Sequence, residues 1–200
     1  MNSWRARGML ATALVEMSVK KEPVMSDTAH SSLPPDDPKR ELKLVNADAL
    51  SARHVSVAGG TYTILLTGAD TAGRYCLIDM LVPDGGGPPP HRHDFEEMFT
   101  LLEGELEFTF RGEKSTVGAG STLNIPANAP HSFINKSGRP ARFLCLCTPA
   151  GQEEFFLAVG DPVASRTAPP PALSNEERAE RGKRAQALAP KYRTEILRQP

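Results

Sequence analysis

The sequence has few cysteines, almost no net charge and no long apolar run, and each shortage excludes a class of protein. Its 200 residues hold three cysteines, a small and odd number that makes a poor disulfide framework. The formal net charge of -1 gives no excess of positive charge with which to bind nucleic acid or an anionic membrane. No stretch approaches the roughly 20 apolar residues that a membrane helix needs. We therefore expect a cytoplasmic protein that binds neither nucleic acid nor membrane.

The N-terminal segment, residues 1–40, is expected to be disordered. Residues 26–40 are polar and rich in proline and serine, so they cannot bury an apolar face. Two arginines precede a short apolar run at residues 8–15, but a glutamate ends this run and no small-residue cleavage site follows closely, so a signal peptide is not expected. Met25 is a hypothetical natural start site, which an intact mass beginning at Met1 would exclude.

From residue 41 the sequence changes to short apolar runs separated by turn residues, which predicts an all-β domain over residues 41–160. The clearest alternation lies at residues 105–110, where polar and apolar side chains take turns and mark one wet and one buried face. Several such runs with tight turns and no helix between them indicate a sandwich or a barrel. Cys145 and Cys147 lie two apart in the last run, and we interpret them as small buried side chains rather than as a redox or metal pair.

The C-terminal part of the chain has a different character. A short helix is compatible with the glutamate-rich and phenylalanine-rich segment near residue 155, and residues 161–173 form a proline-rich linker. Ser174 and Glu177 then make a capping box, which predicts a helix over 175–189. We expect residues 174–200 to form a helical appendage with a tail.

Three residues that can bind a metal share one face of a predicted strand. If residues 91–102 are extended, then His91, His93 and Glu97 point the same way as the apolar side chains that follow them. A buried carboxylate without a counter-charge is costly, and a divalent cation that also binds both imidazoles would resolve the cost. An exposed histidine-rich loop is the alternative for this segment alone. His131 follows a later strand, and an antiparallel barrel can bring it beside the first pair.

These residues carry a resemblance to the cupin family. Residues 85–104 fit the first cupin motif, G(x)5HxH(x)3E(x)6G, at every defined position, and residues 120–135 resemble the second motif, G(x)5PxG(x)2H(x)3N. One position departs from the second motif, because its inner glycine is Asn128 here. Asparagine tolerates a left-handed turn better than other non-glycine residues, so the same turn is still expected.

The resemblance implies a jelly-roll β-barrel that binds one divalent transition metal ion. The implied metal ligands are His91, His93, Glu97 and His131, with Glu97 also acting in catalysis as a proton acceptor. The ion would be iron, manganese, nickel, cobalt, copper or zinc, because a mixed nitrogen and oxygen set suits all of them. Three aromatic residues are expected to form the wall of the substrate pocket: Phe99, Phe108 and Phe133.

The resemblance is strongest to the quercetin 2,3-dioxygenase-like group, which implies a dioxygenase that oxidises a small enolisable or aromatic substrate with dioxygen. Two alternatives stay open. One is a metal-dependent isomerase or lyase that acts on a small sugar or keto acid, and the other is a cupin that binds a metabolite without turnover. The sequence distinguishes these readings only weakly, since folds host many chemistries. The resemblance further implies a homodimer.

Overall fold

The computed structural model describes residues 33–49 and 51–198. The chain divides into two units, residues 1–41 and residues 42–200. The described part of the first unit, residues 33–41, is exposed and contains no helix or strand. The predicted disorder of residues 1–40 and the hypothetical start at Met25 lie almost wholly outside the described residues. Every helix and strand described below belongs to the second unit.

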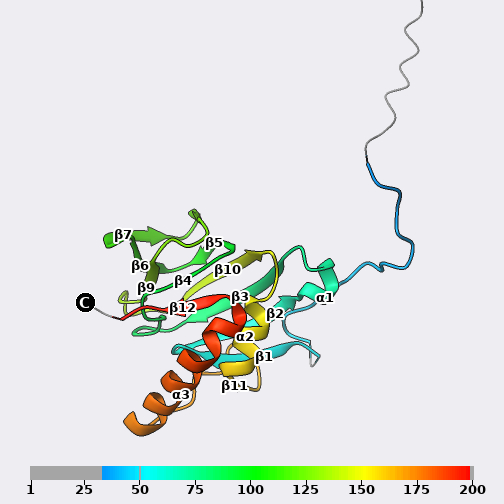
Figure 1. The fold of residues 1–200 in the computed structure, drawn as a ribbon. Helices are drawn as coiled ribbons and strands as arrows, with labels where there is room; N and C mark the ends of the chain where they lie inside the picture. The colour runs from blue at the N-terminus through cyan, green and yellow to red at the C-terminus, as the bar shows by residue number, and fades with distance from the viewer. Residues whose placement is uncertain (1–32, 50, 199–200) are drawn as a thin grey trace, which may run out of the picture. The chain divides into compact units, whose positions relative to one another are not determined.

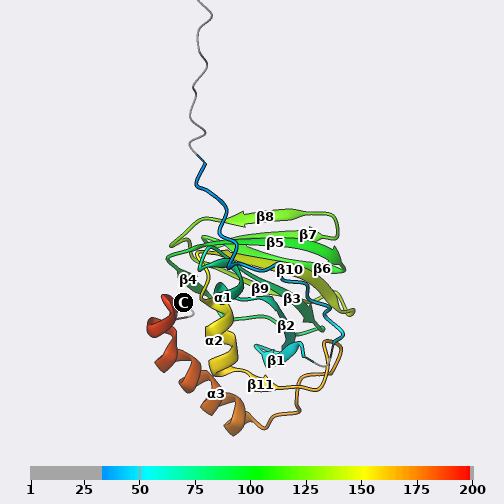
Figure 2. The same cartoon turned by 90° about the vertical axis from the view of Figure 1, so that its right-hand side faces the viewer.

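The second unit is built from two antiparallel sheets (Figures 1 and 2). The seven-stranded sheet has the order β11-β1-β2-β3-β10-β5-β8 and the five-stranded sheet has the order β12-β4-β9-β6-β7. The strands of the first sheet are β1 (Arg53–Val57), β2 (Gly60–Leu66), β3 (Cys76–Val82), β5 (Glu96–Glu103), β8 (Thr122–Ile125), β10 (Ala141–Thr148) and β11 (Asp161–Pro162). Those of the second are β4 (His91–His93), β6 (Glu105–Phe110), β7 (Glu113–Gly118), β9 (His131–Ile134) and β12 (Thr194–Ile196). The predicted all-β jelly-roll class is confirmed, with the strands paired within two sheets.

Alternation along the strands places the core between the sheets. In β6, Leu106 and Phe108 are buried while the side chains between them are less buried, as the pattern of residues 105–110 predicts. In β10, Phe143, Cys145 and Cys147 are fully buried. The interpretation of the two cysteines as buried side chains is therefore confirmed, although their neighbours give them a further role described below.

The strand predicted over residues 91–102 is in fact two strands in different sheets. β4 ends at His93 and β5 begins at Glu96, so the chain crosses from the five-stranded to the seven-stranded sheet between them. Phe95 lies in this crossing and is only 3% exposed. Its ring stacks on the His93 ring with a centroid separation of 3.9 Å, and this packing stabilises the bend. His91, His93 and Glu97 still point the same way, as the sequence predicts, because β4 and β5 both turn these side chains toward the interior.

Four helical segments complete the unit: α1 (Gly68–Thr71), α2 (Gln152–Val159), α3 (Asn175–Leu188) and the 3-10 helix η1 (Ala189–Tyr192). The predicted capping box is present at the start of α3, where the Ser174 hydroxyl accepts from the Glu177 backbone N–H and the Glu177 carboxylate accepts from the Ser174 N–H. α2 contacts β1, β3 and α3, so the two longer helices lie together at one end of the sheets (Figure 2). No helix in the described ranges is long and apolar enough to cross a membrane.

The C-terminal tail returns to the sheets, which the sequence analysis did not predict. β12 pairs with β4, with Thr194 opposite His93 and Ile196 opposite His91. Arg92 points outward from β4 and forms an ion pair of 2.6 Å with Glu195 of β12. The last strand therefore supports the segment that carries the two histidines of the first motif.

Candidate metal centre

Three short strands bring His91, His93, Glu97 and His131 together between the two sheets. His91 and His93 come from β4, and His131 comes from β9, where it lies directly opposite His91 in the ladder. Glu97 comes from β5 in the facing sheet. The cluster thus joins both layers of the fold. His93, Glu97 and His131 are each at most 3% exposed, whereas His91 is half-buried.

The ligand atoms of the four side chains all lie within 4.8 Å of one another. The Nε2 atoms of His93 and His131 each lie 3.1 Å from the same carboxylate oxygen, Oε2 of Glu97. The His91 ring lies 4.2 Å from the His131 ring, measured between centroids. This arrangement gathers three imidazoles and one carboxylate around a common point.

Hydrogen bonds to the backbone fix which nitrogen of each imidazole faces that point. The Nδ1 atoms of His91, His93 and His131 each lie 2.9 Å from a backbone carbonyl oxygen, those of Pro89, Phe95 and Ala129. A carbonyl can only accept, so each Nδ1 carries a proton and each Nε2 is left to face the cluster. Metal-binding histidines are typically oriented in this way. The donor chemistry therefore fits a divalent transition metal.

The electrostatics of the four side chains favour a positive charge among them. Burial raises the pKa of Glu97, but hydrogen bonds from His131 and His93 outweigh this and hold the pKa well below its usual value. Burial lowers the pKa of His131, yet the hydrogen bond with Glu97 outweighs it and raises the pKa. Burial and the neighbouring charge of His131 lower the pKa of His91 to about 4. Without metal, protons shared with Glu97 supply the positive charge, so metal and protons compete for the site.

Two buried thiols lie behind Glu97. Cys145 Sγ lies 3.3 Å and Cys147 Sγ lies 3.8 Å from Oε1 of Glu97, the oxygen that does not face the histidines. The hydrogen bond with Cys147 lowers the pKa of Cys145, but burial and the charge of Glu97 outweigh it and raise the pKa to about 12. Cys145 is therefore a protonated thiol that donates to Glu97. The sequence analysis missed this contact because it depends on the pairing of β10 with β5, which places Cys147 opposite Glu97 and leaves no local pattern.

The turns that carry the motif residues adopt the backbone expected from the sequence. Asn128 has a φ of 66°, so it takes the left-handed conformation in place of the motif's glycine. Gly104 has a φ of 74°, and a Cβ there would lie 2.7 Å from the Pro140 carbonyl oxygen. The Asn135 amide donates to the carbonyl oxygens of Val82 and Arg139, which ties the turn after β9 to β3.

Residues 78–147 match the family model of the cupin domain. The chain belongs to the cupin superfamily. The matched residues run from within β3 to within β10 and include all four members of the cluster.

Two curated proteins and one solved structure illustrate the similarity. The chain is 30% identical over 122 residues to quercetin 2,3-dioxygenase from Bacillus subtilis, a match covering 59% of this chain and 36% of that enzyme. It is 34% identical over 82 residues to an uncharacterised protein from Methanocaldococcus jannaschii, covering 40% of this chain and 66% of that one. It is 26% identical to the polyketide cyclase RemF from Streptomyces resistomycificus, whose structure matches with a TM-score of 0.48 and covers 70% of this chain and 92% of that one. The cupin thus spans about a third of the length of the Bacillus enzyme.

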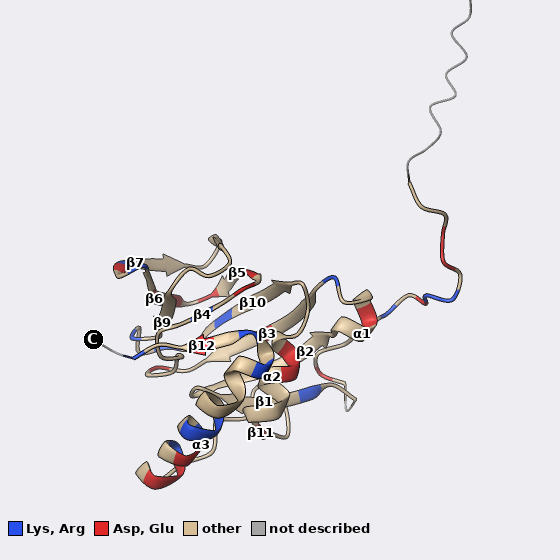
Figure 3. Ribbon diagram, in the orientation of Figure 1, with Lys and Arg blue, Asp and Glu red and all other residues tan. Residues whose placement is uncertain are grey.

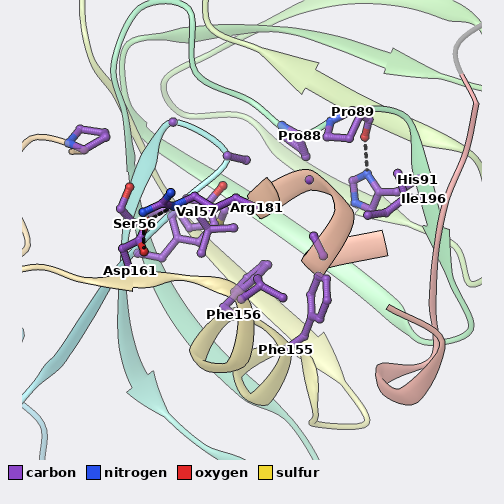
Figure 4. Close-up of a pocket in the computed structure, with 18 of the residues that line it drawn as sticks. Ser56, Val57, Pro88, Pro89, His91, Phe155, Phe156, Asp161, Arg181 and Ile196 are labelled. Carbon is purple, nitrogen blue, oxygen red and sulfur yellow. Dashed lines mark hydrogen bonds and ion pairs between the residues drawn. The ribbon is translucent and has the colours of Figure 1, made fainter. Parts of the chain in front are cut away.

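A cavity of about 590 Å³ opens onto the cluster (Figure 4). His91 and Glu97 line it, whereas His93 and His131 lie behind the wall. Of the three aromatic residues expected there, Phe99 and Phe133 line the cavity. Phe108 is not among the lining residues, and its ring packs edge-on against Phe99 with 6.3 Å between ring centroids.

Sequence reasoning also missed the outer wall of the cavity. α2 contributes Gln152 and Phe156, and α3 contributes Arg178 and Arg181. These residues lie after the two motifs, and no local pattern distinguishes them from an ordinary surface helix. His54, which the sequence analysis set apart from the site, lies in β1 and hydrogen-bonds to Thr63.

Proposed function

We propose that this cupin is a metal-dependent enzyme and that it oxidises a small enolisable or aromatic molecule with dioxygen. The observation that carries the proposal is the convergence of three Nε2 atoms and one carboxylate oxygen at the inner end of a cavity. The similarity to the Bacillus quercetin 2,3-dioxygenase supports the choice of reaction. The chain spans only part of that enzyme. The reaction proposed for this chain is therefore based mainly on the residues of its own site.

Under this proposal His91, His93, Glu97 and His131 would hold the metal. The metal, when bound, would act as a Lewis acid that lowers the pKa of a hydroxyl placed against it and would provide the redox chemistry for dioxygen. The set of nitrogen and oxygen donors suits iron, manganese, nickel, cobalt, copper or zinc. Only four protein ligands are provided, which leaves room for a substrate oxygen.

The protein's own residues would then do three things. Glu97 would accept the proton of the substrate hydroxyl, since its carboxylate lines the cavity and its pKa is held low enough for it to be ionised. The aromatic walls at Phe99 and Phe133 would exclude water and hold a flat or apolar substrate. Cys145 would keep Glu97 in place by its hydrogen bond to Oε1.

A metal-dependent isomerase or lyase acting on a small keto acid is the second candidate. The strands contribute no lysine or arginine to the cavity wall, but α3 contributes two arginines. Such cationic groups are what an anionic substrate of that kind would need. Both candidates share the metal centre and differ only in the need for dioxygen.

The test is to load the protein anaerobically with each of the six metals and mix it with flavonols, 1,3-diketones and short keto acids. We expect oxygen uptake with at least one enolisable substrate, and none with Glu97→Gln. Turnover under nitrogen would favour the isomerase or lyase. Ligand binding with no turnover under either gas would contradict an enzymatic role.

A further inference from the structure

The outer half of the cavity has features that the metal centre does not explain. Its wall is formed by α2, α3 and the proline-rich segment between β11 and α3 (Figure 4). Two polar side chains on this wall are considered in turn: Gln152, which is buried, and Arg178, which is exposed on α3 at the cavity mouth. The role proposed below for these two residues rests on the proposed function in one respect, because that function places the reacting group at the inner end of the cavity.

Gln152 is among the residues that line the cavity, and its side-chain amide is buried. Its side chain is 3% exposed, and its Oε1 has no hydrogen-bond partner among the described residues. A buried amide oxygen without a partner is destabilising by roughly 1–3 kcal/mol. The neighbours on the same wall, Phe155 and Phe156, are apolar and offer no donor. A ligand hydroxyl would satisfy this oxygen once the side chain turns to present it to the cavity, because the oxygen has almost no accessible surface as it stands.

Arg178 carries a positive charge at the cavity mouth, and no neighbouring carboxylate in the described part of the chain pairs with it. Apart from Tyr62, five lining residues are ionisable, namely His91, Glu97, Asp161, Arg178 and Arg181. The inner two belong to the metal centre. Arg181 is bound by both oxygens of Asp161, at 2.6 and 3.1 Å. Arg178 has no carboxylate three or four residues away on α3, and no ion pair joins it to any of the residues that the structure describes.

The two ends of the cavity are well separated. The C-terminal end of α3 leads through η1 into β12, which pairs with β4 beside His91 and His93. α3 runs away from that strand in both views (Figures 1 and 2), and Arg178 lies ten residues before Leu188, roughly 15 Å along the helix axis. The wall between the two ends is mainly apolar, with Tyr62, Met80 and Phe156 among its members.

We propose that the cavity binds an elongated, mainly apolar acid, whose anionic end lies against Arg178 and whose body carries a hydroxyl that donates to Gln152. The end of the molecule opposite the acid reaches His91 and Glu97. α3 therefore contributes to substrate selection, although it belongs to neither cupin motif. Figure 3 shows that basic and acidic residues are interspersed along α3, so the selection depends on Arg178 rather than on the overall charge of the helix.

The proposal is tested with three sets of probes: 4-hydroxyphenylalkanoates of increasing chain length, their neutral primary amides, and the phenylalkanoates that lack the hydroxyl. Binding to the full chain is measured by calorimetry, with and without prior chelation. We expect at least one hydroxylated acid to bind more tightly than both its amide and its dehydroxylated counterpart. Failure of every acid to bind would overturn the proposal, whether or not the metal centre proves active.

Arg178→Gln tests the anionic end. We expect it to weaken binding of the acid about fivefold and to leave the amide unchanged. Lys183→Gln is the matched control, because it removes the same charge from an exposed position on α3 that does not line the cavity. Equal losses for the acid and the amide, or equal effects of the two substitutions, would contradict the assignment.

Gln152→Met tests the hydroxyl. We expect it to weaken binding of the hydroxylated acid about fivefold and to leave the dehydroxylated acid unchanged. Because Oε1 has no protein partner, the same substitution is expected to leave Tm unchanged or to raise it. A lower Tm together with an unchanged preference for the hydroxyl would show that Gln152 serves the fold, and the assignment would be wrong. Both outcomes are independent of metal loading and oxygen uptake, so they separate this proposal from the proposed reaction.

Discussion

The two ends of the cavity are built in opposite ways. At the inner end, His93, Glu97 and His131 are part of the core, and each makes at least two hydrogen bonds that fix its side chain. At the outer end, α3 has no buried residue at all. It is attached by the ion pair of Arg181 with Asp161, by the hydrogen bond from Arg184 to the Ala158 carbonyl oxygen, and by partly buried apolar side chains near its C-terminal end.

This contrast indicates how the chain divides its tasks. Chemistry at a metal requires ligands held to within a fraction of an ångström, and a core of paired strands provides that. Substrate selection tolerates more variation, and a surface helix can change its side chains without disturbing the core. We therefore expect substitutions at the inner end to affect metal binding, and those at the outer end to affect substrate binding alone.

The largest effect is expected at the centre of the cluster. His131→Ala and Glu97→Gln each remove one ligand and leave the remaining groups without their partner, so we expect metal affinity to fall at least 100-fold. The measurement is metal content per chain after purification without chelators, together with a competitive titration. His54→Gln is the control, since His54 is a histidine of β1 outside the cluster. A His131→Ala variant that keeps a full complement of metal would contradict the ligand set.

The second effect concerns pH and the metal-free protein. The pKa of His91 is about 4 in the folded protein and 6.5 in an unfolded chain. Between these values the unfolded chain binds a proton that the folded chain does not, so the free energy of unfolding must fall as the pH is lowered from 6.5 to 4. We expect His91 to contribute about 2 kcal/mol of this loss, allowing for its partial exposure.

Denaturant unfolding of the chelated protein at pH 6.5 and pH 4 gives this quantity. His91→Gln cannot take up the proton, so its stability is expected to fall less over the same interval. An equal loss in the variant and in the natural protein would show that other groups cause the whole pH dependence.

The residues at the inner end of the cavity could be predicted from the sequence, whereas those at the outer end could not. The ligands at 91, 93, 97 and 131 could be found because strand parity and fixed motif spacing survive in any compatible fold. The crossing at Phe95 could not, because a bend between sheets depends on packing and leaves no local pattern. Gln152 and Arg178 were equally invisible, since their importance comes from which surface α2 and α3 cover.

The strand β12 gives a similar lesson about the chain's C-terminus. Thr194 and Ile196 favour strands, but a run of three residues is too short to predict one, and the pairing with β4 makes it a strand. The capping box of α3, by contrast, is a local signal, and it predicted the helix to within one residue of its observed end. Local hydrogen bonding is readable in a sequence, while long-range pairing of short segments is not.

A third prediction addresses the thiol behind Glu97. Cys145→Ala removes the hydrogen bond to Oε1, and we expect metal affinity to fall about tenfold. Cys76→Ala is the matched control, because Cys76 is equally buried but makes no hydrogen bond to Glu97 in the described structure. Both substitutions leave a small cavity, so both are expected to lower stability by about 1 kcal/mol. If the two variants bind metal equally well, the thiol does not position Glu97.

The smallest effect is expected where α3 is attached. Asp161→Asn breaks the ion pair with Arg181 at a half-buried site, so we expect a loss of stability of about 0.5–1 kcal/mol and no change in metal content. Hydrogen exchange is expected to rise in α3 and to stay unchanged in β5 and β9. A change in metal affinity would show that the two ends are coupled, contrary to the division of tasks described above.

The most direct test of the central claim is X-ray absorption of the metal-loaded protein. The account predicts a shell of imidazole nitrogens and carboxylate oxygen at about 2.0–2.2 Å from the metal, with the scattering pattern of several histidines. Glu97, Cys145 and Cys147 form a second group that could hold a metal. A sulfur shell at about 2.3 Å would place the ion there, and would contradict the assignment of the three histidines and Glu97.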